Sequence, residues 1–479
     1  MSEILDYIGG SFRPGVAGSG TPSINPSDRD DVVGIVPDGS PEDVADAVAA
    51  ASGALDAWRF LTGSARAEHL HRWAAAIDAR KDELARALMR EVGKPIGEAM
   101  GEIGRCIVIL RYYAGEAVRT VGDVVPAQAA STLQFSLREP LGVVGLITPW
   151  NFPAAIPLWK AAPALAFGNT VVLKPAEQAS HVAMLLAETA HAAGLPHGVL
   201  NVVCGRGDIV GDALVRADEV RAVSFTGSTT VGAHVAAVCA ARNVRYQTEM
   251  GGKNVVIVMS DADLDLAARL TAAGAMRFAG QKCTATSRAI VMKRVADAFA
   301  EKLADAVAAL QLGPVEDANA AVGPLIDEAA RERVLGALAD VGGQLACGGG
   351  VPKGAVYDRG FYVEPAIVRN ADPDAPIAQE ELFGPVVALM HADGLDEALE
   401  LANRTRYGLS ASLFTRDIGS ALKYIHRIEA GLVRVNGDTT GVDPHAPFGG
   451  MKGSSSGSRE QGVAAREFYT EYRTVQISG

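Results

Sequence analysis

The stretch NTVVLKPAEQASHVAMLLAETAHAAGLPHGVLNVVCG, residues 169–205, decides the fold. It starts and ends with short apolar runs, TVVL and VLNVV, which are typical of strands buried on both faces. Between them, SHVAMLLAETAHAAGLP predicts a helix that Gly194 and Pro196 end. A strand, a helix and another strand in this order predict a parallel βαβ unit.

The same alternation extends outward in both directions. Residues 141–149 (LGVVGLITP) are an apolar run ended by proline, and residues 220–228 (VRAVSFTGS) are another. A second round begins at residues 254–278, and residues 376–415 carry further strand and helix signals. Residues 40–118 have a helical pattern. The chain is therefore predicted to be an α/β protein with parallel sheets.

Two segments have the pattern of peripheral strands. Residues 120–140 are β-rich with a polar middle, as in a hairpin, and the final residues, 471–479, alternate like a strand. Such strands leave open edges unless another element pairs with them. A second subunit is one way to supply that partner.

Bulk properties narrow the class of protein. A chain of 479 residues is predicted to have two to three domains, and its net charge of −12 argues against nucleic-acid binding. Five cysteines without repeated spacing do not predict a disulfide framework, which favours the cytoplasm. The sequence also shows no secretory signal, no stretch of membrane-spanning length and no metal-binding motif.

One cysteine stands apart from the other four, which lie in apolar or glycine-rich surroundings and have the pattern of small core residues. Cys283 lies in GQKCTAT, residues 280–286, directly after Lys282. A cation and backbone amides beside a cysteine favour the nucleophilic thiolate. A nucleophile and a structural cysteine are both open from this context alone.

Two further motifs supply groups that such a nucleophile needs. Asn151 lies in TPWNFP, directly after a predicted strand, where α/β sheets bind ligands. Its amide is either part of a turn before Pro153 or a donor for a developing oxyanion. Glu249 lies in TEMGGKN and is either a solvent-facing turn residue or a general base that activates water.

Two motifs predict contacts to a nucleotide cofactor. Lys174 and Glu177 follow a buried strand and can hold the hydroxyls of an adenosine ribose. Residues 224–232, SFTGSTTVG, open a helix after a strand, so Ser228 and its neighbours can present amides to a pyrophosphate. Neither is the usual dinucleotide or P-loop fingerprint.

Taken together, the motifs resemble the aldehyde dehydrogenase superfamily over essentially the whole chain. They are TPWNFP, LKPAEQ, FTGST, EMGGKN, GQKCTATSR, EELFGPV and APFGGMKGSS, in the family's order and spacing. The resemblance implies a Rossmann-like cofactor domain (residues 1–119 and 141–248) and an α/β catalytic domain (249–458). It also implies a small β oligomerisation element (120–140 and 459–479), and hence a homodimer or homotetramer.

The resemblance implies a role for individual residues. Cys283 attacks the aldehyde to give a thiohemiacetal, Asn151 and the Cys283 amide form the oxyanion hole, and Glu249 activates the water that hydrolyses the resulting thioester. The implied cofactor contacts are Lys174 and Glu177 at the adenosine ribose, Trp150 and Ser228 near the pyrophosphate, and Glu381 and Phe383 at the nicotinamide ribose. The carboxylate of Glu177 favours NAD, with NADP as the alternative.

The substrate is predicted from the same resemblance, which is greatest to the α-ketoglutarate-semialdehyde (2,5-dioxopentanoate) dehydrogenases. Arg277 lies six residues before Cys283, at the spacing of the carboxylate-binding arginine of succinate-semialdehyde dehydrogenases. Those enzymes carry a second arginine where this chain has Trp159. We therefore expect α-ketoglutarate semialdehyde as substrate, with Arg277, Lys282, Trp159 and Phe448 in its pocket.

The alternatives are a succinate-semialdehyde or a broad aliphatic aldehyde dehydrogenase. A coenzyme A-acylating enzyme is disfavoured, because such relatives need no base like Glu249. A structural protein on the same scaffold is disfavoured, because Cys283, Asn151 and Glu249 are all present.

Overall fold

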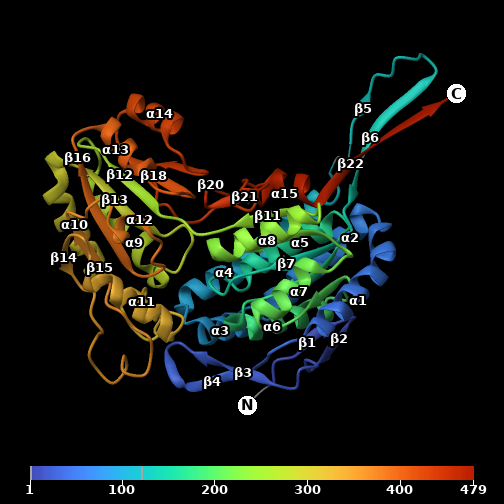
Figure 1. Ribbon diagram of the computed structural model, residues 1–479, viewed down its shortest axis with the longest axis horizontal. Coiled ribbons are helices and arrows are strands. Elements are labelled where there is room, and N and C mark those ends of the chain that lie inside the picture. The colour runs from blue at the N-terminus through green and yellow to red at the C-terminus, as the bar shows by residue number, and fades with distance from the viewer. Residues whose placement is uncertain (1–2, 120–121) are drawn as a thin grey trace.

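The computed structural model describes residues 3–119 and 122–479. Two open sheets lie side by side with helices packed against each, and a narrow three-stranded sheet projects from one end (Figure 1). The predicted α/β class is confirmed.

The first sheet contains the predicted βαβ unit. Strand β8 (Thr170–Lys174) leads into helix α6 (Ser180–Ala192) and then into β9 (Leu200–Val202), which pairs parallel with β8. Every residue of both strands is buried, which explains their unbroken apolar character. The sheet's order is β2-β1-β9-β8-β7-β10-β11-β21. The remaining strands are β1 (Asp6–Ile8), β2 (Ser11–Arg13), β7 (Val143–Ile147), β10 (Val220–Thr226), β11 (Arg245–Glu249) and β21 (Ser455–Gly457).

The first helix beside this sheet begins at a residue whose side chain caps it. The Ser40 hydroxyl accepts a hydrogen bond from the Asp43 amide at 3.2 Å, and α1 (Pro41–Arg59) starts there. The other helices of this half are α2 (Gly63–Ala79), α3 (Lys81–Val92), α4 (Ile96–Glu116), α5 (Ala155–Ala166), α7 (Asp212–Arg216) and α8 (Thr229–Ala241). A β3 (Gly20–Asn25) and β4 (Asp28–Pro37) hairpin completes the half.

The second sheet has the order β14-β15-β16-β13-β12-β18-β19, and β14 alone among these strands runs antiparallel to its neighbour. Its strands are β12 (Asn254–Val258), β13 (Thr286–Met292), β14 (Gln344–Cys347), β15 (Ala366–Arg369), β16 (Val386–Ala392), β18 (Ser410–Phe414) and β19 (Leu432–Val435). Its helices are α9 (Leu264–Met276), α10 (Ala296–Ala308), α11 (Glu328–Ala339), α12 (Pro376–Gln379), α13 (Leu395–Asn403) and α14 (Ile418–Arg427). A short pair, β17 (Tyr407–Gly408) and β20 (Met451–Lys452), lies beside it.

The projecting sheet is built from β5 (Val124–Val125), β6 (Thr132–Pro140) and β22 (Thr470–Ser478), in the order β22-β6-β5. The predicted hairpin and C-terminal strand therefore pair with each other, although residues 120–121 of the hairpin lie outside the described residues. The segment 459–479 is not all strand, because α15 (Gly462–Tyr469) precedes β22. Strand β21 also returns to the first sheet, beside β11.

No helix in residues 3–119 or 122–479 is both long and apolar enough to cross a lipid bilayer.

Candidate active site

The site lies where the carboxyl ends of parallel strands in the first sheet face the second sheet. Strands β7, β10 and β11 end at Ile147, Thr226 and Glu249. Loops that follow such strand ends are the usual ligand-binding position in open α/β sheets. A cavity of about 290 Å³ lies there, lined by Pro149, Trp150, Asn151, Thr226, Gly227, Ser228, Met250, Gly251, Cys283, Arg333, Glu381 and Phe383.

The backbone before Cys283 holds an uncommon conformation. Phe278, Ala279 and Gly280 all have positive φ, at 55°, 51° and 67°. A side chain at Gly280 would place its Cβ 2.2 Å from the Gly384 carbonyl oxygen, so only glycine fits. After the turn, the Asn254 side-chain amide donates to the carbonyl oxygens of Cys283 and Ala285, both at 2.8 Å. Backbone strain stored beside a site persists only when such contacts hold it.

The charged groups that act most strongly on the Cys283 thiol are carboxylates. Burial, followed by the carboxylates of Glu381 and Glu249, raises the pKa of the Cys283 thiol to about 12. Lys282 instead pairs with Glu98 on α4, with Nζ 3.0 Å from Oε2. The expectation that Lys282 favours the thiolate is therefore wrong, because its ammonium group is directed at another carboxylate.

Asn151 is buried and held from both ends. Its side-chain amide donates to the Gln281 backbone carbonyl oxygen at 3.0 Å. The backbone carbonyl oxygen of Asn151 accepts from Lys94 Nζ at 2.7 Å. Lys94 pairs with the buried Glu102, which also accepts from the amides of residues 154 and 155, each at 3.0 Å. Sequence reasoning missed this buried pair, because nothing in the helical pattern marks an inward-facing Lys or Glu.

Glu249 lies close to the same cavity, and only one of its two carboxylate oxygens has a hydrogen-bond partner within the described part of the chain. Oε2 accepts a hydrogen bond from the Ser455 hydroxyl at 2.5 Å, whereas Oε1 is buried and has no partner within the described part of the chain. Burial raises the pKa of Glu249 well above its usual range, and the nearby carboxylate of Glu460 raises it further. Glu460 pairs with the buried Lys160, which also donates to Ser224 Oγ at 2.7 Å. Neither member of that pair was found from the sequence.

The expected adenosine end has matching polar groups. Lys174 Nζ lies 3.3 Å from Glu177 Oε1, and this oxygen also accepts from the Gly207 amide at 2.6 Å. Ser228 caps α8, whose N-terminus opens at the cavity and offers the positive end of its dipole. A ribose diol and a pyrophosphate fit this donor and acceptor set.

The expected nicotinamide end is lined by aromatic rings and a carboxylate. Trp150 meets Phe383 edge-on, with ring centroids 5.6 Å apart. Glu381 accepts from the Gly252 amide at 2.9 Å, and burial raises its pKa to about 7. A Cβ at Gly251 would lie 2.0 Å from Glu381 Oε2, so a larger residue there would displace the Glu381 carboxylate. These three predicted residues lie on the cavity that Cys283 also lines.

A second, smaller cavity of about 50 Å³ reaches Cys283. It is lined by Arg105, Phe152, Ala155, Trp159, Cys283, Thr284, Gly441, Val442 and Phe448. Trp159 and Phe448 form one wall, with ring centroids 5.5 Å apart. The sequence predicted both of these aromatic residues for the substrate pocket. Cys283 thus lies between a cavity with nucleotide-binding groups and a narrow, mainly apolar one.

The comparisons with known proteins agree over the full length. Residues 13–475 match the model of the aldehyde dehydrogenase family. The chain belongs to this family. An α-ketoglutaric semialdehyde dehydrogenase of Bacillus subtilis is 46% identical over 480 residues, which cover 100% of this chain and 98% of that one. A succinate-semialdehyde dehydrogenase of Escherichia coli is 38% identical over 476 residues, covering 98% and 97%. The structure of an NAD-dependent aldehyde dehydrogenase from Sinorhizobium meliloti has a TM-score of 0.96 and 38% identity, covering 100% and 95%.

The aldehyde dehydrogenase fold does not bring every predicted residue to the pocket. Arg277 is exposed at the C-terminal end of α9, and neither Arg277 nor Lys282 lines the two cavities beside Cys283 among the described residues. Arg105 and Arg333 line them instead and were not predicted. Sequence spacing places Arg277 near Cys283 along the chain, but the left-handed turn between them separates their side chains.

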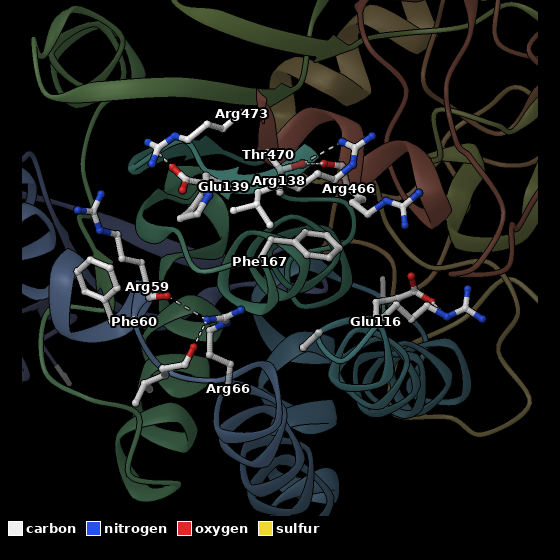
Figure 2. Close-up of a pocket in the computed structure, with 15 residues that line it drawn as sticks. Arg59, Phe60, Arg66, Glu116, Arg138, Glu139, Phe167, Arg466, Thr470 and Arg473 are labelled. Atoms are coloured by element: carbon white, nitrogen blue, oxygen red, sulfur yellow. Dashed lines mark hydrogen bonds and ion pairs between the residues drawn. The ribbon is translucent and has the colours of Figure 1, made fainter. Parts of the chain in front are cut away.

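Figure 2 shows another cavity of this aldehyde dehydrogenase, of about 330 Å³, at the root of the projecting sheet. Its six arginines are Arg59, Arg66, Arg119, Arg138, Arg466 and Arg473. Each has a protein partner: Asp56 for Arg59, backbone carbonyls for Arg66, Glu116 for Arg119, Glu467 for Arg138 and Arg466, and Glu139 for Arg473. This cavity is therefore not a candidate for the anionic end of a substrate.

Proposed function

We propose that this enzyme oxidises α-ketoglutarate semialdehyde to 2-oxoglutarate, with NAD as the hydride acceptor. The observation that carries the proposal is the narrow cavity at Cys283, which has apolar walls and one cationic side chain. Such a pocket suits a short chain that ends in a carboxylate. Succinate semialdehyde shares that feature and is the runner-up, followed by uncharged aliphatic aldehydes.

In the first step, the sulfur of Cys283 forms a bond to the aldehyde carbon and the thiol proton is released. The carbonyl oxygen becomes an oxyanion. The side-chain amide of Asn151 lies on the same cavity and has a second hydrogen that its bond to Gln281 does not use. It therefore supplies one oxyanion donor, and the Cys283 backbone amide supplies the other.

NAD, when bound, accepts the hydride from the tetrahedral carbon. The acyl group then remains on Cys283 as a thioester. A water molecule attacks the acyl carbon and gives a proton to Oε1 of Glu249. The carbon–sulfur bond then breaks with its electron pair going to sulfur, the carboxylic acid leaves, and the proton returns from Glu249 to regenerate the thiol. Because Glu249 supplies a base for water, hydrolysis is favoured over transfer to coenzyme A.

The residues at the adenosine end favour NAD over NADP. The carboxylate of Glu177 accepts the Gly207 amide and lies where a ribose diol would bind. A 2′-phosphate there would be repelled by the carboxylate. Lys174 lies beside it and partly offsets that repulsion, so NADP is the weaker alternative.

We also propose that the projecting sheet mediates a homodimer or homotetramer. Its strands expose large apolar side chains, with Val124 79% and Ile477 56% exposed. Exposed apolar strands with open edges need cover. If Val124→Asp and Ile477→Asp leave the protein monomeric in sedimentation velocity, the assignment holds; an unchanged assembly contradicts it.

The five cysteines, all described, are free, which supports a reducing cytoplasm.

Steady-state kinetics test the proposed substrate. We would compare kcat/KM for 2,5-dioxopentanoate, succinate semialdehyde and hexanal with NAD, and then repeat the best substrate with NADP. At least a tenfold preference for 2,5-dioxopentanoate is expected. Equal turnover of hexanal would leave the family unchanged and refute the substrate.

A further inference from the structure

Arg105 is the one cationic side chain among the described residues that line the smaller cavity at Cys283. Of the described residues that line this cavity, Arg105 alone carries a charge. Apart from Cys283 and Thr284, the other residues are apolar or small. The residue is half-buried. Within residues 3–119 and 122–479 it makes no hydrogen bond and has no carboxylate at ion-pairing distance. Asp443 attracts it only from farther away.

Helix α4 explains how this side chain reaches the cavity. Glu98, Glu102 and Arg105 are spaced four and three residues apart, so they share one face of the helix. The two carboxylates are used: Glu98 binds Lys282, and Glu102 binds Lys94 and two backbone amides. One turn further on, Arg105 lines the smaller cavity together with Phe152, Trp159 and Phe448, and has no carboxylate at ion-pairing distance in the described part of the chain.

Other arginines near the two sheets contrast with Arg105. The buried Arg288 donates to the carbonyl oxygens of residues 253, 401 and 402, at 2.9 to 3.2 Å. The six arginines of the cavity in Figure 2 each have a partner. Burying a cation without a partner costs free energy, and burial lowers the pKa of Arg105 accordingly. An anionic ligand would remove that cost.

We propose that Arg105 binds the distal carboxylate of the aldehyde substrate and thereby selects short chains that carry an acid opposite the aldehyde. A guanidinium holds a carboxylate through two parallel N–H···O bonds. The apolar rings exclude water from the pair, which strengthens it. The inference rests on the proposed function, because it assumes a carboxylated aldehyde, and it replaces Arg277 and Lys282 in that role.

The test compares Arg105→Met and Arg105→Lys with the wild-type enzyme on 2,5-dioxopentanoate, succinate semialdehyde and hexanal. A hydrogen-bonded charge pair is worth about 1.5–3 kcal/mol, so Arg105→Met should lower kcat/KM for both acids by about 10- to 100-fold, mainly through KM. The kcat/KM for hexanal should change less than about threefold, because hexanal has no carboxylate to pair with residue 105. Arg105→Lys should retain part of the kcat/KM that Arg105→Met loses, because lysine keeps the positive charge but cannot donate the two parallel hydrogen bonds of a guanidinium.

A second readout does not depend on turnover of an acid. Glutarate should inhibit hexanal oxidation competitively in the wild type, and Arg105→Met should abolish that inhibition. Arg111→Met is the matched control, because Arg111 is an exposed arginine on the same helix. It should behave like the wild type. Melting temperature and NAD binding, measured for each variant, report folding.

The outcomes separate this inference from the proposed function. If the wild type does not prefer the acids to hexanal, the proposed substrate fails. If it prefers them and Arg105→Met slows all three substrates equally, Arg105 only packs the pocket and the inference is overturned. If Arg277→Ala removes the preference while Arg105→Met does not, the carboxylate binds outside the small cavity, and the inference is again overturned.

Discussion

The side-chain amide of Asn151 donates a hydrogen bond to the carbonyl oxygen of Gln281, two residues before Cys283, at 3.0 Å. This bond joins the loop after β7 of the first sheet to the nucleophile's loop in the second. It fixes the amide in the cavity without using its second hydrogen. The donor for the oxyanion is therefore oriented before substrate binds, which is the condition for electrostatic stabilisation of the transition state.

Asn151→Ala is expected to lower kcat by about 10²–10³, because one preorganised oxyanion donor is lost. The fold should survive, since Lys94 bonds to the backbone of residue 151 and not to its side chain. Pre-steady-state and steady-state rates of NADH formation check this, with circular dichroism as the folding control. A loss smaller than about threefold would exclude Asn151 from the oxyanion hole.

Glu249→Gln should separate the two halves of the reaction. Hydride transfer does not need the base, but hydrolysis of the thioester does. A rapid burst of one NADH per active site should therefore be followed by a steady state slowed by about 10²-fold or more. Stopped-flow absorbance at high enzyme concentration measures both phases. Loss of the burst together with the steady state would instead assign Glu249 to the attack by Cys283.

The ascending limb of the pH–kcat profile should lie above the range of an ordinary carboxyl group, because burial raises the pKa of Glu249 well above its usual value and the base must be deprotonated to act. Glu460 raises that pKa and Lys160 lowers it. Glu460→Gln should therefore move the ascending limb of the pH–kcat profile to lower pH, and Lys160→Met should move it to higher pH. Both variants break the same buried pair, so a shift in one common direction would show that unfolding, and not charge, is responsible.

Glu102→Ala should destabilise the protein by about 3–5 kcal/mol, because it leaves the buried Lys94 without its counter-ion. It also removes the acceptor of two backbone amides. Glu98→Ala is the matched control on the same helix. The side chains of its pair with Lys282 are 11% and 21% exposed, so this pair is less completely buried than Lys94–Glu102 and a smaller loss is expected. Urea unfolding at fixed protein concentration measures the free energy of unfolding of both variants. Equal losses of stability would refute the difference expected between the two ion pairs.

Glu177→Gln should shift cofactor choice towards NADP. Removing the carboxylate removes the repulsion of a 2′-phosphate, while Lys174 stays in place to attract it. We expect the ratio of kcat/KM for NADP to that for NAD to rise by about tenfold, equivalent to about 1.4 kcal/mol. Glu188→Gln, on the exposed side of α6, is the control. An unchanged ratio would mean that Glu177 does not face the adenosine ribose.

The sequence by itself determined the α/β fold and the family. Residues 169–205 predict a βαβ unit because buried parallel strands must be continuously apolar and their helices amphipathic, and the structure has that unit at β8, α6 and β9. The sequence also predicted Cys283, Asn151 and Glu249 as the catalytic residues, because each lies in a recognisable local motif, and the structure places Cys283 and Asn151 on one cavity. These predictions depend only on residues that are close together in the sequence.

Only the tertiary structure decided what surrounds Cys283. Lys282 is its neighbour in sequence but pairs with Glu98, whereas Arg105 is 178 positions away and lines its cavity. The buried pairs Lys94–Glu102 and Lys160–Glu460 likewise join distant segments. The direction of a side chain depends on which face of its helix or turn is buried against another element, and that packing involves residues far apart in the chain. No local pattern encodes it.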